Sequence, residues 1–140
     1  MGYLDTSALV AYYCPEALSA QVEAEMAREA ELTISPLVDV ELHSAVAQKV
    51  RTADLDISDA HRIVSRFRLH LSSGQYRVVP IGEREYELAR DWLARFTTPL
   101  RALDALHLAA TFANDLTVLT ADQVLARCAK HFGVKCKLIS

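Results

Sequence analysis

Four of the 18 acidic residues stand apart because apolar neighbours flank them in the sequence. These four are Asp5, Glu41, Asp104 and Asp122. A single acid near a helix start is usually a cap or a partner of the helix dipole. Four carboxylates in one partly dry crevice would instead repel one another and would need to be neutralised. Mg²⁺ or Mn²⁺ does this with oxygen ligands, and such ions drive phosphodiester hydrolysis, which is the chemistry that these residues predict.

The elements that would position these acids are short apolar runs that alternate with longer, mostly amphipathic segments. We expect strands at residues 2–4, 32–35, 76–81, 116–120 and 135–139. We expect helices at residues 7–13, 15–30, 36–50, 59–71, 83–96, 103–113 and 122–131. This alternation predicts an α/β fold with a mainly parallel central sheet covered by helices. Residues 1–140 are expected to form a single domain, since the length leaves little room for two.

The expected topology brings the four acids together. Asp5 and Asp122 directly follow strands, whereas Glu41 and Asp104 lie near the amino ends of helices. In an open parallel sheet, binding sites form beyond the carboxyl ends of the strands. We therefore expect all four carboxylates at that edge. Asp115 precedes its strand and belongs to the opposite edge, so it is left out of the predicted site.

Other polar residues near these acids allow a site role as well as a structural one. His107 lies three residues after Asp104 and so shares its helix face, but a histidine on an apolar helix is more often a hydrogen-bonded core residue. Arg101 precedes Asp104 and is the best candidate among the arginines to meet a substrate phosphate. The sequence has no zinc-spaced Cys/His cluster and no glycine-rich phosphate loop.

Local patterns also predict helix starts and inward faces. Ser35 before Pro36 indicates an N-cap followed by proline at the first helical position, and Ser58 is expected to cap the next helix. The expected inward positions of the first of these helices are Leu37, Val40, Glu41, Ala45 and Val46. In the segment 83–96, the residues expected to share one apolar face are Leu88, Trp92 and Phe96.

Composition excludes several classes of protein. Hydrophobic residues make up 51% and charged residues 24% of the chain, a balance typical of a globular protein with a core. The net charge of −3 argues against a module that binds nucleic acid by phosphate neutralisation alone, but not against an enzyme whose metal ions meet the phosphate. The three cysteines form no C-x-x-C pair, and no secretory signal or membrane-spanning run is visible. We therefore expect a reduced, cytoplasmic protein without membrane contact.

Four segments carry a resemblance to a known family. They are LDTSAL from Leu4, residues 35–42, LRALDALHLA from Leu100 and LTAD from Leu119. In order, spacing and total length they resemble the motifs of PIN-domain nucleases, specifically the VapC-like toxin ribonucleases of prokaryotic toxin–antitoxin pairs. The resemblance extends over nearly the whole chain. It implies a three-layer α/β/α PIN-like domain.

The resemblance also implies roles for particular residues and partners. The metal-binding, catalytic acids of the family fall on Asp5, Glu41, Asp104 and Asp122. Its small polar residues fall on Thr6, Ser7 and Thr120, which would hold water or a ligand by hydrogen bonds. The implied activity is hydrolytic endonuclease cleavage of RNA, dependent on Mg²⁺ or Mn²⁺. The implied partners are a VapB-like antitoxin, which neutralises the enzyme, and a second copy of the chain in a homodimer.

Two other readings of the acids stay open. Another magnesium-dependent phosphoesterase on a similar α/β fold is one, although a haloacid-dehalogenase-like phosphatase would need a second aspartate where Ser7 stands. A non-catalytic interaction module with merely structural acids is the other. This module predicts that divalent metal leaves the melting temperature unchanged, whereas a metal site predicts a rise.

Overall fold

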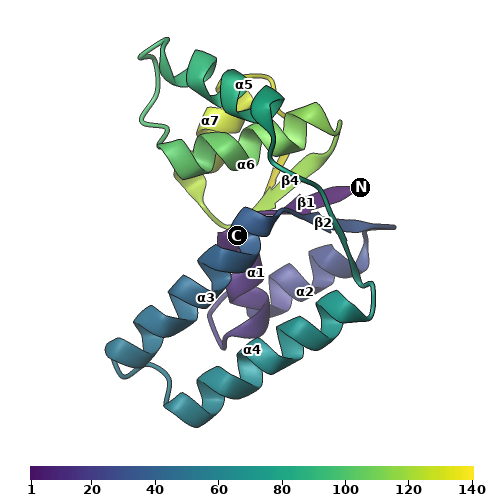
Figure 1. The fold of residues 1–140 in the computed structure, drawn as a ribbon, viewed down its shortest axis with the longest axis vertical. Helices are drawn as coiled ribbons and strands as arrows, with labels where there is room; N and C mark the ends of the chain where they lie inside the picture. Colours follow the sequence, from purple (N-terminus) through teal and green to yellow (C-terminus); the bar gives the residue numbers. More distant parts are fainter.

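A parallel sheet of five strands lies at the centre of the computed structural model, which describes residues 1–140 (Figure 1). The strands are β1 (Gly2–Leu4), β2 (Leu32–Ile34), β3 (Tyr76–Val78), β4 (Thr117–Thr120) and β5 (Cys136–Leu138). Their order in the sheet is β3-β2-β1-β4-β5, and every neighbouring pair is parallel. The predicted α/β class with a mainly parallel sheet is therefore confirmed.

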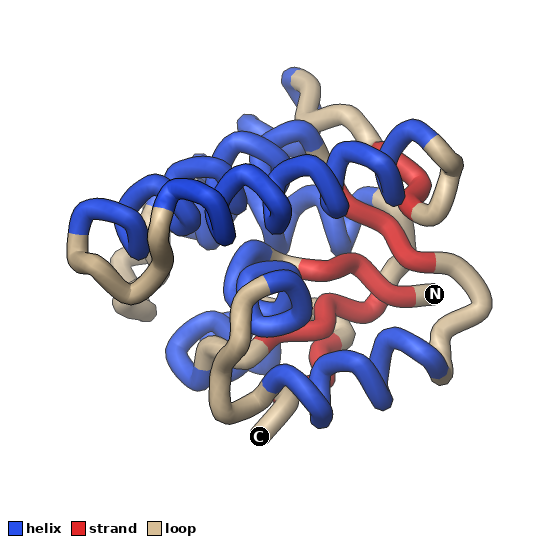
Figure 2. The backbone as a smooth tube through the Cα atoms, turned by 90° about the horizontal axis from the view of Figure 1, so that it is seen from below, coloured by secondary structure: helices blue, strands red, loops and turns tan.

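Seven helices cover the two faces of this sheet. They are α1 (Thr6–Tyr13), α2 (Ser19–Ala27), α3 (Pro36–Arg51), α4 (Ile57–Ser72), α5 (Glu83–Leu93), α6 (Ala102–Ala113) and α7 (Gln123–His131). Helices α1 to α4 lie on one side of the strands and α5 to α7 on the other (Figure 1). Figure 2 shows the strands between the two groups of helices. The arrangement is thus three-layered, and the central strands β1 and β4 are buried on both faces, whereas the edge strands β3 and β5 are partly exposed.

The core lies along β1, β4 and the middle of α6. Tyr3 and Leu4 are fully buried on β1, as are Val118 and Leu119 on β4. Every residue of α6 from position 105 to 111 is buried, which confirms the interpretation of this segment as an interior helix. No helix combines the length and the apolar character required to cross a bilayer.

Three local predictions were wrong. Asp56, not Ser58, caps α4, because its side chain accepts a 2.7 Å hydrogen bond from the Asp59 amide. Val40 was expected to face inward but is 68% exposed, and Phe96 is 91% exposed because α5 ends at Leu93. Val40 lies on α3 but beside its buried face. Phe96 lies beyond the last residue of α5, so the helical spacing no longer applies to it.

Candidate active site

Asp5 lies at the junction of β1 and α1, where it is the N-cap of the helix and is only 3% exposed. Its carboxylate accepts hydrogen bonds from the Ala8 amide at 3.0 Å, from the Thr120 hydroxyl at 2.5 Å and from the Ser7 hydroxyl at 2.7 and 2.9 Å. Burial raises the pKa of Asp5, and these hydrogen bonds offset part of the rise. Ser7 has one proton and can donate to only one carboxylate oxygen at a time, so an acceptor position remains for a cation.

Ser7, which follows β1, and Thr120, the last residue of β4, connect the ends of these two strands by hydrogen bonds. Their hydroxyl oxygens lie 3.2 Å apart. The Ala121 amide donates to the Ser7 hydroxyl oxygen at 3.0 Å, and the Asp122 amide donates to that of Thr120 at 3.0 Å. The two small polar residues therefore hold the backbone that carries Asp5 and Asp122, in addition to contacting the Asp5 carboxylate directly.

Glu41 extends from the second turn of α3 and lies half-buried against α1 and α6. One of its oxygens, Oε1, accepts hydrogen bonds from the Thr6 hydroxyl at 2.8 Å and from His107 Nε2 at 2.5 Å. Burial opposes ionisation of this carboxyl, but the hydrogen bond and electrostatic attraction of His107, together with the Thr6 hydrogen bond, hold the pKa of Glu41 below its ordinary value. Glu41 is therefore ionised at neutral pH.

Asp104 lies in the first turn of α6 and interacts electrostatically with the other three acids. Its pKa is raised, first by burial and then by the negative charges of Asp122, Glu41 and Asp5, while His107 acts in the opposite direction. The structure thus brings the four sequence-predicted acids within electrostatic reach of Asp104. This is the repulsive cluster expected at the carboxyl edge of the sheet.

Asp122 is the N-cap of α7 and uses a single oxygen for that purpose. Its Oδ1 accepts hydrogen bonds from the amides of Val124 at 2.8 Å and Leu125 at 3.1 Å. No protein group donates to the other oxygen, Oδ2. The capping role, which was the structural alternative for each acid, is therefore compatible with a ligand role for Asp122.

No lysine or arginine neutralises the cluster. The four acids form no ion pair other than that of Glu41 with His107, whereas the excluded Asp115 pairs with Lys135 at 2.8 Å on the surface. Arg101 is exposed, forms no ion pair, and immediately precedes α6. An all-oxygen donor set without a cationic side chain fits a hard divalent cation. In the observed arrangement, no three of the chain's His, Cys, Asp and Glu side chains form a group that could hold a metal ion.

Sequence reasoning missed two residues next to the site. Tyr3 and Ser35 are fully buried, and the Tyr3 hydroxyl bridges Ser35 Oγ and His107 Nδ1. Ser35 occupies the predicted N-cap position of α3 but makes no side-chain capping bond. His107 is 2% exposed, so the expected core role is confirmed, and it contacts Glu41 as well. For His107 the sequence offered one local signal, its position three residues after Asp104 on the same helix face. Neither Tyr3 nor Ser35 had a comparable signal.

Comparison with known protein families identifies the fold. A family model described as "PIN domain" matches residues 2–131. The chain belongs to the PIN domain family. The four acids of the candidate site, Asp5, Glu41, Asp104 and Asp122, lie inside the range that matches the PIN domain. No curated protein matched the sequence.

Solved structures resemble this PIN domain over almost its full length. VapC20 of Mycobacterium tuberculosis, described as a sarcin-ricin loop cleaving toxin, has a TM-score of 0.71 at 19% identity, covering 91% of this chain and 94% of the other. FitAcB of Neisseria gonorrhoeae has a TM-score of 0.73 at 22% identity, covering 97% and 96%. VapBC2 of Rickettsia felis, bound to a fragment of its promoter DNA, has a TM-score of 0.71 at 16% identity, covering both chains completely. At these identities the likeness supports the fold.

Proposed function

We propose that this PIN-domain protein is a metal-dependent endoribonuclease toxin that hydrolyses RNA phosphodiester bonds and is neutralised by a cognate antitoxin. The observation that carries the proposal is the cluster formed by Asp5, Glu41, Asp104 and Asp122, whose charges act on one another without a lysine or arginine to balance them. Such a cluster is typical of sites that bind divalent cations and phosphates. Membership of the PIN domain family supports the same reading.

The four acids would hold Mg²⁺ or Mn²⁺. The bound ions would neutralise the phosphate, activate a water molecule and stabilise the leaving oxygen. Thr6, Ser7 and Thr120 orient the carboxylates by the hydrogen bonds described above. Arg101, exposed beside Asp104, is the proposed contact for an RNA phosphate. The negative charge of the whole chain then matters little, because the cations meet the substrate.

The proposed partners follow from the similar structures. One of these is described as a sarcin-ricin loop cleaving toxin, and another is a toxin–antitoxin complex from Klebsiella pneumoniae. By analogy we propose RNA as substrate and a VapB-like protein as inhibitor of this chain. Fold alone does not define chemistry, so the two alternatives, an interaction module and another magnesium-dependent phosphoesterase, require an experimental test.

Purified, antitoxin-free protein is expected to cut total RNA into discrete fragments with Mg²⁺ or Mn²⁺ and to leave it intact with chelator. Asp5→Asn should abolish cleavage, because it removes a ligand charge but keeps an oxygen to cap α1. Gel electrophoresis and fragment-end sequencing provide the measurement. Cleavage that persists in chelator would contradict the metal-dependent mechanism. Hydrolysis of small phosphoesters but not of RNA would favour the other phosphoesterase.

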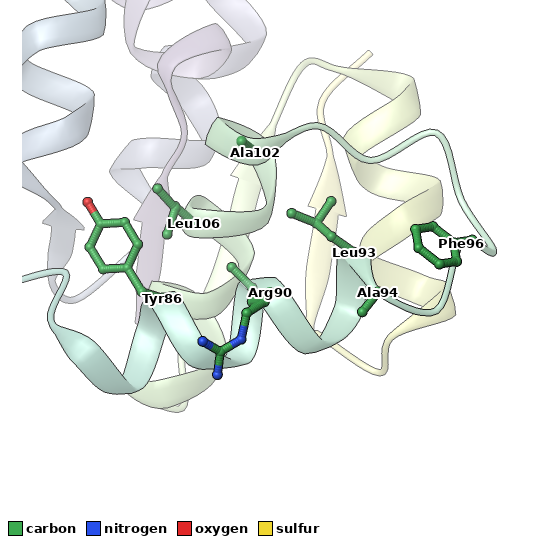
Figure 3. A pocket seen from close by; sticks show the side chains of 8 residues that line it. Tyr86, Arg90, Leu93, Ala94, Phe96, Ala102 and Leu106 are labelled. Atoms are coloured by element: carbon green, nitrogen blue, oxygen red, sulfur yellow. The ribbon is translucent and has the colours of Figure 1, made fainter.

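An apolar groove lined by residues of α3, α5 and α6 supports the proposed homodimer. We define it by two adjoining hollows of about 440 and 310 Å³ that share Tyr86 and Leu106. Figure 3 shows the larger hollow, which is lined by Leu93 from the end of α5 and by Ala102 from the start of α6. The smaller one extends to Val40, the residue before Glu41. Exposed apolar surface of this kind marks an interface, and we propose that a second copy of the chain covers it.

Tyr86→Glu is expected to convert a dimer into a monomer. Tyr86 is 58% exposed on α5, so the fold should tolerate a charge, but an unpaired charge in an apolar interface would cost at least about 2 kcal/mol, or about 30-fold in affinity. Light scattering coupled to size exclusion measures the mass. Leu69→Glu is the matched control, because Leu69 is 65% exposed on α4, outside the groove. A monomeric wild-type chain would refute this part of the proposal.

A further inference from the structure

A buried chain of hydrogen bonds leads from the interior of the sheet to the acid cluster. Ser35 Oγ lies 2.8 Å from the Tyr3 hydroxyl, which lies 2.8 Å from His107 Nδ1. His107 Nε2 then lies 2.5 Å from Glu41 Oε1. Ser35 and Tyr3 are 0% exposed and His107 is 2% exposed, so water does not interrupt the chain.

The proton at the end of this chain can be assigned. An ionised carboxylate only accepts, so His107 Nε2 must carry the proton that it shares with Glu41. The other ring nitrogen, Nδ1, is held by the Tyr3 hydroxyl, which is held in turn by Ser35 Oγ. Burial raises the pKa of Tyr3, so its hydroxyl stays protonated and can take part in both bonds. Both nitrogens of the His107 ring are therefore fixed by buried partners.

The result at Glu41 is an asymmetric carboxylate. Oε1 is held by two donors, His107 and Thr6, whereas Oε2 has no protein partner. Two donors on one oxygen fix the rotation of the carboxylate and leave the second oxygen to face a cation. Hydrogen bonds of this kind orient metal ligands and tune their affinity.

Core packing alone does not account for these residues. A phenylalanine would fill the space of the Tyr3 ring equally well. Burying three polar side chains costs desolvation free energy, which is offset only if all three form hydrogen bonds. The Ser35 hydroxyl forms its hydrogen bond with Tyr3 although Ser35 stands where a serine would cap α3. These buried polar groups therefore act on Glu41, the one partly exposed residue among the four that the hydrogen bonds connect.

We propose that Tyr3 and His107 are positioning residues for Glu41, which hold its Oε1 through a buried relay so that Oε2 is presented to the metal. This inference rests on the proposed metal-dependent function. It assigns a role to the hydroxyl of Tyr3 that neither its burial nor its place on β1 requires. The relay also explains why a histidine, a poor partner for hard cations, lies directly behind an oxygen ligand.

The test measures the affinity of the intact protein for Mn²⁺ in the absence of RNA. Electron paramagnetic resonance of the free ion gives the fraction of Mn²⁺ that is bound. Tyr3→Phe should weaken binding about tenfold, and His107→Leu should weaken it more, because it removes the donor to Glu41 itself. In RNA cleavage, Tyr3→Phe should need more Mn²⁺ for half-maximal activity but reach the wild-type rate at saturation. A residue with a packing role alone would not shift the metal dependence in this way.

Two controls separate the possible outcomes. Tyr76→Phe removes another buried hydroxyl, one that lies 2.5 Å from the Tyr13 hydroxyl and outside the site, and should leave Mn²⁺ affinity unchanged. Asp104→Asn should lose Mn²⁺ binding. If it does so while Tyr3→Phe and His107→Leu, both shown to be folded, bind like the wild type, the relay is refuted and the proposed function stands. If the wild type itself does not bind Mn²⁺ at millimolar concentration, the proposed metal-dependent function is refuted, and so is the relay, which rests on it.

Discussion

Asp104→Asn is expected to abolish RNA cleavage while making the metal-free protein more stable. Asp104 carries a raised pKa because burial and the charges of Asp122, Glu41 and Asp5 disfavour its ionised form. Removing that charge relieves the repulsion and should raise the melting temperature in chelator by about 3 °C, as expected for ~1 kcal/mol in a domain of this size. The same change removes a proposed ligand, so activity should fall at least about 100-fold and the stabilisation by Mn²⁺ should disappear.

The pH dependence of metal-free stability checks the cause of this effect. A carboxyl whose folded-state pKa is raised binds its proton more tightly in the folded state, so stability increases as the pH falls from neutral toward the ordinary aspartate pKa of about 3.9. Asp104 and Asp5 both act in this direction, and Glu41, whose pKa is lowered, acts against them. The gain on acidification should therefore be smaller in Asp104→Asn than in the wild type.

Asp115→Asn is the matched control for both measurements. Asp115 is exposed, pairs with Lys135 and adopts a positive φ of 52°, a conformation that asparagine accepts readily. We expect wild-type cleavage and an unchanged response to Mn²⁺. If Asp104→Asn instead cuts RNA like the wild type, Asp104 is not a required metal ligand. If neither protein cuts RNA and Mn²⁺ leaves both melting temperatures unchanged, the acid cluster is structural and the interaction module becomes the better reading.

Leu108→Ala is expected to cause the largest loss of stability among single truncations in α6. Leu108 is 0% exposed, so the change removes buried methyl groups and leaves a cavity that the packed helix cannot close. The expected cost is about 3 kcal/mol, with a melting temperature lowered by about 10 °C. Thermal or urea unfolding in chelator measures the difference without a contribution from bound metal.

Leu103→Ala is the control for that truncation, because it makes the same chemical change on the same helix. Leu103 is 48% exposed, and the expected loss is below about 1 kcal/mol. Similar losses at both positions would mean that the burial of α6 contributes less to stability than the structure indicates. That result would also weaken the argument that α6 is a rigid support for Asp104 and His107.

Much of the site could be predicted because its parts are local. Asp5 and Asp122 follow strands, and Glu41 and Asp104 lie near the amino ends of helices, so the rule for parallel sheets was sufficient to predict a common edge. The apolar character of α6 likewise identified an interior helix. Helix boundaries were less certain, as Asp56 in place of Ser58 shows, because several polar residues near a helix start compete to cap it.

The amino-acid sequence by itself determined the α/β class, the identity of the four acids and their common edge, since hydrophobic periodicity and strand ends are written locally in the chain. Only the tertiary structure decided which side chains touch. Thr120 reaches Asp5 across 115 residues, and Tyr3 reaches His107 across 104. Both contacts exist because β1 lies between β2 and β4 and α6 packs beside them, and no local pattern specifies that order. Long-range hydrogen bonds depend on the packing of distant elements, which a single sequence does not state.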